Sequence, residues 1–305
     1  MDNILKLDAA ETVFFKTELE SVKSRTYDYK RPELKMRTLV PTMSDANPGA
    51  QSIVYYQYDA VGMAKIVESY AKDFPRADVK RKRFDNPVVS LGASYGYSVQ
   101  DIRSAQMASV PLEQRKANAA RLAVMQKEDN LAAFGDEDAG FTGLFNNPNT
   151  TEYTLSNPGA GTEFVNKTPD QILADLNGMV SKVIELTNGV ESPDTMILPN
   201  EQHTYLTSTA RSANSDTTIM EYFLSKNVSV RQVEPYYKLK GAGAAGSDRL
   251  FMYRRDADHL SLEIPQDFEQ MPVQTEGMEY VVYCHQRFGG VIFYYPLATI
   301  FADGI

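Results

Sequence analysis

Residues 98–147 read SVQDIRSAQMASVPLEQRKANAARLAVMQKEDNLAAFGDEDAGFTGLFNN, and this stretch predicts two consecutive helices. Ser98 and Asp101 form a capping-box pattern, in which each side chain can accept a hydrogen bond from the other residue's backbone N–H. Pro111 fits the first turn of a helix but not its interior, so we expect it to end the first helix and begin the second. Gly135 supplies the left-handed residue with which the second helix ends.

The second helix, expected over residues 111–134, is long and polar. Ala, Leu, Gln, Lys, Glu and Arg dominate it, and all of them favour helix. About 24 helical residues span on the order of 36 Å. We therefore expect a spine helix that lies along a sheet and keeps one edge free for a partner. The expected packing face is Leu112, Ala119, Leu122, Ala123 and Gln126, and the expected solvated residues are Arg115, Lys116, Arg121, Lys127 and Glu128.

Composition indicates an acidic globular protein. Of the 305 residues 43% are hydrophobic, and 31 Lys and Arg stand against 40 Asp and Glu, which gives a net charge of −9. Binding of nucleic acid by bulk attraction is therefore not expected. The single Cys284 excludes an intrachain disulfide and a cysteine-based zinc site. The sequence shows neither a signal-peptide pattern nor an apolar run of membrane length, so a cytoplasmic protein without membrane contact is expected.

The first 50 residues read as an arm. Residues 9–23 fit one amphipathic helix with Phe14 on its apolar face, and the Pro-rich polar run that follows Tyr29 predicts no regular element. The large apolar groups of such an arm need a surface to bury them. A neighbouring subunit is a suitable host, because segments of this kind can fold on binding.

Residues 51–97 predict a long projecting hairpin. Residues 53–58 alternate as a strand with two apolar faces, and residues 88–97 form another strand. Between them, a strand at 79–84 carries Lys80, Arg81, Lys82 and Arg83, and we expect this basic run near a Pro-marked tip. The run could contact phosphate, but salt bridges to acidic patches on a neighbouring copy are the favoured interpretation.

The middle of the chain predicts a compact block of helices and strands after a polar linker at 148–167. Thr168 and Gln171 form a second capping box, which begins a helix that ends at Asn188 and Gly189. A buried strand at 195–198 and a helix capped by Asn200 follow. The remaining expected elements are a helix at 217–226, strands at 228–233 and 250–253, a strand at 260–264, and a hairpin of 280–287 with 291–301 around Gly289 and Gly290. This order is an α+β layout.

No motif of catalysis or cofactor binding is complete. Gly241, Gly243 and Gly246 match the dinucleotide spacing, but a strand pattern follows them where that motif needs a helix. A mobile loop is the favoured interpretation. The acidic turn at 136–138 lacks calcium-loop spacing, and Cys284 and His285 are neighbours on a strand, so their side chains point to opposite faces. We therefore expect no enzyme activity, no cofactor and no metal.

The order of these elements resembles the Hong Kong-97-type capsid fold of tailed phages, a fold that encapsulin shells share. Local sequence also resembles one family of phage major capsid proteins. The motifs that carry this resemblance are SYGYS at 94–98, DIR at 101–103, GFTGLFNNP at 140–148, RFGGV at 287–291 and DGI at 303–305.

The resemblance implies four structural parts. They are an N-terminal arm at 1–50, an extended loop at 51–97, a peripheral domain with the spine helix at 98–150 and 255–290, and an axial domain at 151–254 and 291–305. It also implies a self-assembling virion protein, made in the bacterial host cytoplasm, whose hexamers and pentamers close an icosahedral head around double-stranded DNA. Portal, scaffold or decoration proteins would be further partners. Some relatives cross-link a lysine of the extended loop to a neighbour, and only location makes Lys65, Lys72, Lys80 and Lys82 candidates for that bond.

Two other functions remain open from the sequence. One is an encapsulin-type nanocompartment shell, which the same fold would serve. The other is a nucleotide-using enzyme, which the glycine loop suggests. For the capsid interpretation, the residues expected at contacts between subunits are Lys80, Arg81, Lys82, Arg83, Phe14, Tyr29, Gly241, Gly243 and Gly246.

Overall fold

The computed structural model describes residues 29–61, 78–108, 112–159, 161–212, 214 and 216–305. The chain divides into a unit Met1–Glu33 and a unit Leu34–Ile305. In the first unit the described residues 29–33 are exposed and contain no helix or strand. The helix expected at 9–23, with Phe14, lies outside the described residues, as do Lys65 and Lys72.

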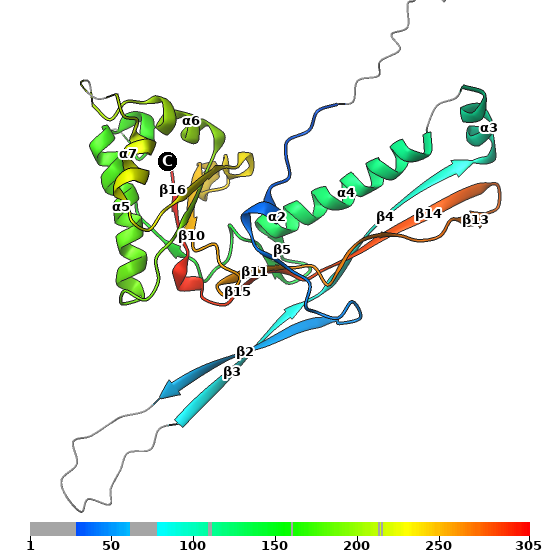
Figure 1. The fold of residues 1–305 in the computed structure, drawn as a ribbon, viewed down its shortest axis with the longest axis horizontal. Coiled ribbons are helices and arrows are strands. Elements are labelled where there is room, and N and C mark those ends of the chain that lie inside the picture. The colour runs from blue at the N-terminus through cyan, green and yellow to red at the C-terminus, as the bar shows by residue number, and fades with distance from the viewer. Residues whose placement is uncertain (1–28, 62–77, 109–111, 160, 213, 215) are drawn as a thin grey trace, which may run out of the picture. The chain divides into compact units, whose positions relative to one another are not determined.

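A long antiparallel sheet supports the spine helix. Strand β14 (Glu279–Phe288) pairs along its whole length with β4 (Val89–Ser98), and its other edge pairs with β12 (Gln266–Gln270) and β13 (Gln274–Glu276). Helix α4 (Leu112–Phe134) runs along β4 and β14 (Figure 1). The expected spine on a sheet is therefore confirmed.

The ends of this helical stretch follow the local signals. Helix α3 (Val99–Ala108) begins with the expected capping box, in which Asp101 N–H donates to Ser98 Oγ at 3.0 Å and Ser98 N–H donates to Asp101 Oδ2 at 3.3 Å. Helix α4 ends at Phe134, and the next residue is Gly135, whose φ is +71°. Pro111 lies outside the described residues.

The packing face of α4 differs from the expected one. Ala120, Val124, Glu128 and Leu131 are buried, whereas Ala119 and Ala123 are exposed and the Glu128 residue is only 3% exposed. The expected face was therefore shifted by one residue, and Glu128 was wrongly placed in solvent. The alanines carry little hydrophobic signal, and the partners of the carboxylate lie far away in the sequence.

Two adjacent carboxylates fasten α4 to distant parts of the chain. Glu128 accepts hydrogen bonds from Arg37 Nε at 2.6 Å and Nη2 at 2.7 Å, and from Gln286 of β14. Asp129 accepts from the Met36 N–H at 3.0 Å and from Tyr236 and Lys238. Buried charges need such partners, because an unpaired one carries a large desolvation cost.

A first hydrophobic core lies between α4, this sheet and a small three-stranded sheet. The small sheet joins β1 (Thr42–Met43), β11 (Leu260–Glu263) and β15 (Gly290–Phe293), with β1 parallel to β11. Helix α2 (Met36–Leu39) buries its apolar side chains in the same core. The expectation of no regular element in the Pro-rich run is therefore wrong at α2. Core members include Met36, Leu39, Val124, Leu131, Leu144, Phe145, Phe251, Leu262 and Phe288.

A second core lies under a five-stranded sheet of order β7-β16-β10-β8-β9. Helices α5 (Pro169–Leu186), α6 (Asn200–Ser208) and α7 (Ile219–Lys226) contribute to this core, and the capping box of Thr168 and Gln171 begins α5 as expected. Core members include Ile172, Leu176, Met179, Val183, Leu206, Phe223 and Ile300. The strands are β7 (Thr151–Glu152), β8 (Thr195–Leu198), β9 (Gln232–Pro235), β10 (Arg249–Tyr253) and β16 (Ile300–Asp303).

Three local expectations are wrong. Gly289 and Gly290 do not turn a hairpin, because β14 pairs with β4, β12 and β13 while β15 leaves to pair with β11. Asn200 is the first residue of α6 rather than its cap, which is Pro199. The strand expected at 228–233 begins later, at β9.

The remaining elements are short. Strands β5 (Gly135–Asp136) and β6 (Phe141–Thr142) pair at the end of α4. The 3₁₀ turns are η1 (Phe164–Asn166), η2 (Tyr237–Leu239), η3 (Ala244–Gly246) and η4 (Pro296–Ala298).

Candidate intersubunit surface

A two-stranded hairpin of β2 (Ser52–Val61) and β3 (Asp78–Pro87) carries the basic run at 80–83, four of the nine predicted contact residues. The strands pair antiparallel over ten residues each, from Ser52 opposite Pro87 to Val61 opposite Asp78. Paired residues share a face of the hairpin, so the register divides it into two faces of different chemistry.

The inner face of the hairpin is anchored to the first core. Tyr55 stacks on Phe84 with ring centroids 5.0 Å apart, meets Tyr294 edge-on at 5.0 Å, and donates to the Phe293 carbonyl at 3.2 Å. The Asn86 amide donates to the Gly289 carbonyl. Burial and neighbouring Tyr294 raise the pKa of Tyr55, so its phenol stays a neutral donor. The base of the hairpin is therefore fixed by its own chain.

The outer face of the hairpin leaves large apolar side chains in solvent. Tyr56 is 44% exposed and Tyr58 65%. Val54 and Val79 lie on the same face and are also exposed. The guanidinium of Arg81 lies 4.6 Å from the centre of the Tyr56 ring, a cation–π arrangement. Contiguous exposed apolar surface of this kind marks an interaction site.

The basic run divides between the two faces. The register places Arg81 opposite Tyr58 and Arg83 opposite Tyr56 on the outer face, and it places Lys80 and Lys82 on the inner face. All four residues are exposed. The run therefore lies along a strand, and the expectation that it marks a hairpin tip is wrong.

A groove of about 1340 Å³ lies beside the inner face of the hairpin. One wall carries Lys80 and Lys82, and the opposite wall carries Val190 and Leu297, which are 74% and 51% exposed. Such a surface can accept an extended segment of another chain, with apolar side chains on one side and acidic ones on the other. Sequence reasoning missed its second wall, which is assembled from separate loops.

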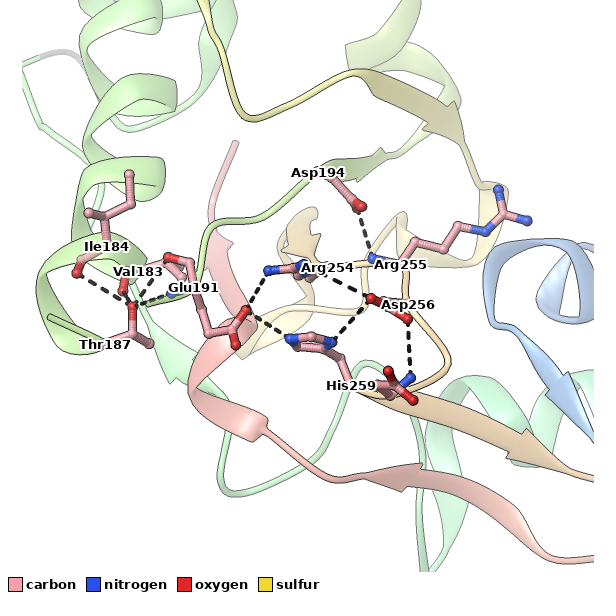
Figure 2. Close-up of polar contacts among 10 residues, drawn as sticks. Val183, Ile184, Thr187, Glu191, Asp194, Arg254, Arg255, Asp256 and His259 are labelled. Carbon is pink, nitrogen blue, oxygen red and sulfur yellow. Dashed lines mark hydrogen bonds and ion pairs between the residues drawn. The ribbon is translucent and has the colours of Figure 1, made fainter. Parts of the chain in front are cut away.

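Four ionisable side chains form a network at one edge of this groove (Figure 2). His259 Nε2 lies 2.8 Å from Glu191 Oε2, and His259 Nδ1 lies 3.7 Å from Asp256 Oδ2. Arg254 contacts Glu191 at 2.9 Å and Asp256 at 4.0 Å. The network ties the loop after α5 to the connection between β10 and β11.

The glycine loop is tied to the last strand of the chain. The Ala244 N–H donates to Asp303 Oδ2 at 2.8 Å, and Asp303 pairs with Arg249 at 2.6 Å. A Cβ at Gly243 would lie 2.8 Å from the Asp303 carboxyl, which explains the glycine there. Strand β10 follows this loop, so it lacks the helix N-terminus that a dinucleotide site needs.

The remaining residues predicted at contacts between subunits lie far from the hairpin in the sequence. The described contacts do not bring them to the hairpin. Tyr29 is 96% exposed in the first unit, Phe14 lies outside the described residues, and Gly241 and Gly246 adopt positive φ in their loop. Cys284 is buried while its neighbour His285 is half-buried on the opposite face of β14.

Within the described ranges, no group of three His, Cys, Asp or Glu could hold a metal ion. No helix in those ranges is both long and apolar enough to cross a membrane.

Comparison with known proteins gives one family match. A family model described as "Major capsid protein" matches residues 62–305. A comparison with curated proteins finds no match.

Solved capsid structures are similar to this chain over nearly its whole length. The capsid of Myoviridae phage XM1 aligns with a TM-score of 0.83 at 16% identity, covering 95% of this chain and 98% of that one. The capsid of a native GTA particle aligns with a TM-score of 0.67 at 12% identity, covering 98% and 99%. A virus-like particle from Pyrococcus furiosus aligns with a TM-score of 0.52 at 13% identity, covering 87% and 90%.

Proposed function

This chain belongs to the major capsid protein family, and on that premise we propose that its copies contact one another through the two faces of the β2–β3 hairpin. Its fold is the Hong Kong-97-type capsid fold. Its function is structural: it is a shell protein of an icosahedral phage head, located in the virion.

The exposed aromatic surface of the hairpin supports this proposal most strongly. Tyr56 and Tyr58 lie in solvent beside Arg81, and aromatic and arginine side chains are the types enriched at the energetic centres of interfaces. A hairpin of two strands is marginally stable by itself. Coverage by a second copy would remove its exposed edges from water. Contacts that pass from copy to copy around a ring use a different surface on each side.

We extend the proposal to the parts of the subunit. Residues 98–150 with 255–290 form the peripheral domain, residues 151–254 with 291–305 the axial domain, and residues 1–50 the arm. The second core supports the axial domain, because all its buried members lie in residues 151–254 and 291–305. The first core joins the peripheral domain to Phe251 of the axial domain and to Met36 of the arm. The groove beside the hairpin is the proposed seat for an extended segment of a neighbouring copy.

The proposed assembly is a set of hexamers and pentamers that encloses double-stranded DNA without sequence-specific binding. The net charge of −9 supports enclosure without tight binding. Portal, scaffold and decoration proteins are the proposed partners, and the proposed site of synthesis is the bacterial host cytoplasm. We also propose that the chain has no catalytic role. A thermal shift that grew with added NAD, ATP or divalent metal would contradict this part.

Electron microscopy of variants tests the role of the hairpin. Purified wild-type protein should form closed shells or capsomers, whereas the double variant Tyr56→Ser/Tyr58→Ser should remain as unassembled subunits. Val165→Ser is the matched control, because Val165 is 68% exposed but lies outside the hairpin, and it should assemble normally. A wild-type chain that stays monomeric at every concentration would overturn the proposal. Normal assembly of the double variant would overturn the role of the outer face.

A further inference from the structure

On one face of the β4–β14 sheet, strand β4 carries small exposed residues. Strand register puts Ser90, Gly92 and Ser94 on one face of β4, and all three are exposed. The opposite face carries Tyr97, whose ring lies 4.6 Å from Lys116 Nζ of α4. Helix α4 therefore covers one face of the sheet. The other face, which we call the outer sheet face, is contacted near Phe288 by the N-terminal segment, where Arg287 donates to the Ala50 carbonyl. At its opposite end Glu279 is exposed.

The outer sheet face carries a pair of like charges. Glu276 of β13 lies directly opposite Glu279 of β14, and both are exposed. Glu279 extends over Gly96, where a Cβ would lie 2.3 Å from its Oε1. Like charges directly opposite on neighbouring strands destabilise a sheet. Among the described residues, neither carboxylate has a cation within ion-pair distance.

The surrounding sequence offers these carboxylates no nearby cation. Residues 264–286 contain four carboxylates and no Lys or Arg. The Tyr283 phenol donates a hydrogen bond to Glu276 at 2.7 Å. This hydrogen bond, together with the negative charges of Glu276 and Glu279, raises the pKa of Tyr283. A cation supplied from outside the chain would relieve the repulsion.

The outer face of the hairpin carries the complementary arrangement. Arg81 and Arg83 are two residues apart on one face of β3, which places them about 6.6 Å apart along the strand. The two glutamates lie about 5 Å apart across their strands. Within the described residues Arg81 has no ion pair, and Arg83 has one with Asp85, at 3.2 Å.

We propose that Arg81 and Arg83 of one copy bind Glu276 and Glu279 of a second copy. Guanidinium groups suit this contact, because each can donate two parallel hydrogen bonds to a carboxylate. The Ser and Gly side of β4 has no large side chain, so the Tyr56 ring can approach its backbone closely. This inference rests on the proposed assembly and names the surface to which the hairpin binds.

Charge reversal tests the pairing. The variant Arg81→Glu/Arg83→Glu should lose shell formation at least tenfold at subunit concentrations where wild type assembles, and Glu276→Arg/Glu279→Arg should do the same. The fourfold variant that combines them should assemble again. Circular dichroism and thermal melting of the unassembled subunits show whether each variant is folded, so that misfolding is not mistaken for lost contact.

A matched control uses the same basic run on the opposite face. Lys80→Glu/Lys82→Glu changes the net charge by the same amount as Arg81→Glu/Arg83→Glu. If this lysine variant has an assembly defect, adding Glu276→Arg/Glu279→Arg should not rescue it. A failure of the fourfold variant to assemble, with every variant folded, would overturn the pairing, as would normal assembly of Glu276→Arg/Glu279→Arg alone. Suppose that Glu276→Arg/Glu279→Arg formed normal shells that lacked only an accessory protein. That result would also overturn the pairing, since a separate cationic partner would then occupy the outer sheet face. The proposed function would survive these results, because it fails only if the wild-type chain does not assemble.

Discussion

Replacing Asp129 with alanine is expected to lower the free energy of unfolding of the subunit by about 4 kcal/mol. This carboxylate is buried on α4, at 4% side-chain exposure. It accepts hydrogen bonds from the Met36 N–H at 3.0 Å, the Tyr236 hydroxyl at 2.8 Å and the Lys238 ammonium at 2.5 Å. Removal of Asp129 therefore takes three hydrogen bonds at once from the contacts of the spine helix with the N-terminal segment and with the chain around η2, although Glu128 keeps its bonds to Arg37.

The magnitude follows from what the alanine leaves behind. Loss of one partner from a buried ion pair costs about 3–5 kcal/mol, and the Lys238 side chain is only 10% exposed. Burial and the nearby Asp129 charge raise the pKa of Tyr236, so it remains a neutral donor, and its unsatisfied hydroxyl adds about 1–3 kcal/mol. Water that enters the vacated space offsets part of this sum. A value near 4 kcal/mol remains.

Urea unfolding of subunits kept below their assembly concentration measures this change. With a slope of about 3 kcal/mol per molar urea, the midpoint should fall by roughly 1.3 M. Lys127→Ala is the control on the same helix: its ion pair with Asp136 is exposed, at 3.3 Å, and its loss should cost less than about 1 kcal/mol. Equal midpoints for the two variants would refute the reasoning that Asp129 fastens the spine.

Three further changes test other parts of the structure. Lys167→Met leaves Asp175 buried without its 2.6 Å partner and should cost about 3–5 kcal/mol in urea unfolding; a neutral result would contradict the assigned pair. Burial raises the pKa of Glu263, so its contribution to stability is present at acidic pH and is lost as pH rises through that raised pKa. Glu263→Gln should therefore melt higher than wild type at pH 7 and show little difference at pH 4, and an unchanged pH profile would count against this. Gly135→Ala, with φ of +71° and a Cβ 2.4 Å from a backbone oxygen, should cost about 3 kcal/mol, against about 1 for Gly189→Ala, where φ is +82° and the space is open; equal costs would exclude the clash.

Local signals allowed much of the helical structure to be predicted. The capping boxes at Ser98 and Thr168 and the left-handed Gly135 each depend on residues within one turn of one another, and all three are present. Strand β8 is bounded by Pro199 and is also as expected. These features need no information from distant parts of the chain.

The packing of those elements could not be predicted in the same way. Glu128 is hydrophilic, and only the distant Arg37 and Gln286 make its burial possible. Gly289 and Gly290 have the composition of a hairpin turn, but β14 pairs with β4 and β15 pairs with β11, so no hairpin forms.

The candidate site was predicted in its residue types and not in its geometry. The basic run was predicted to be a contact element, and this stays a prediction; its division into an arginine face and a lysine face follows from the register of β2 and β3. The groove joins segments that are distant in the sequence, whereas the two glutamates of the pair are three residues apart, at 276 and 279. Their like-signed charges without a nearby cation were the one signal that could have indicated the outer sheet face.

A side-chain-resolution electron-microscopy map of the assembled shell tests the central claim most directly. The claim is that copies of this chain cover one another's exposed hairpin faces. The map should show Tyr56 and Arg81 of each hairpin buried against a neighbouring copy. Hairpins whose outer faces remain in solvent throughout the shell would contradict it.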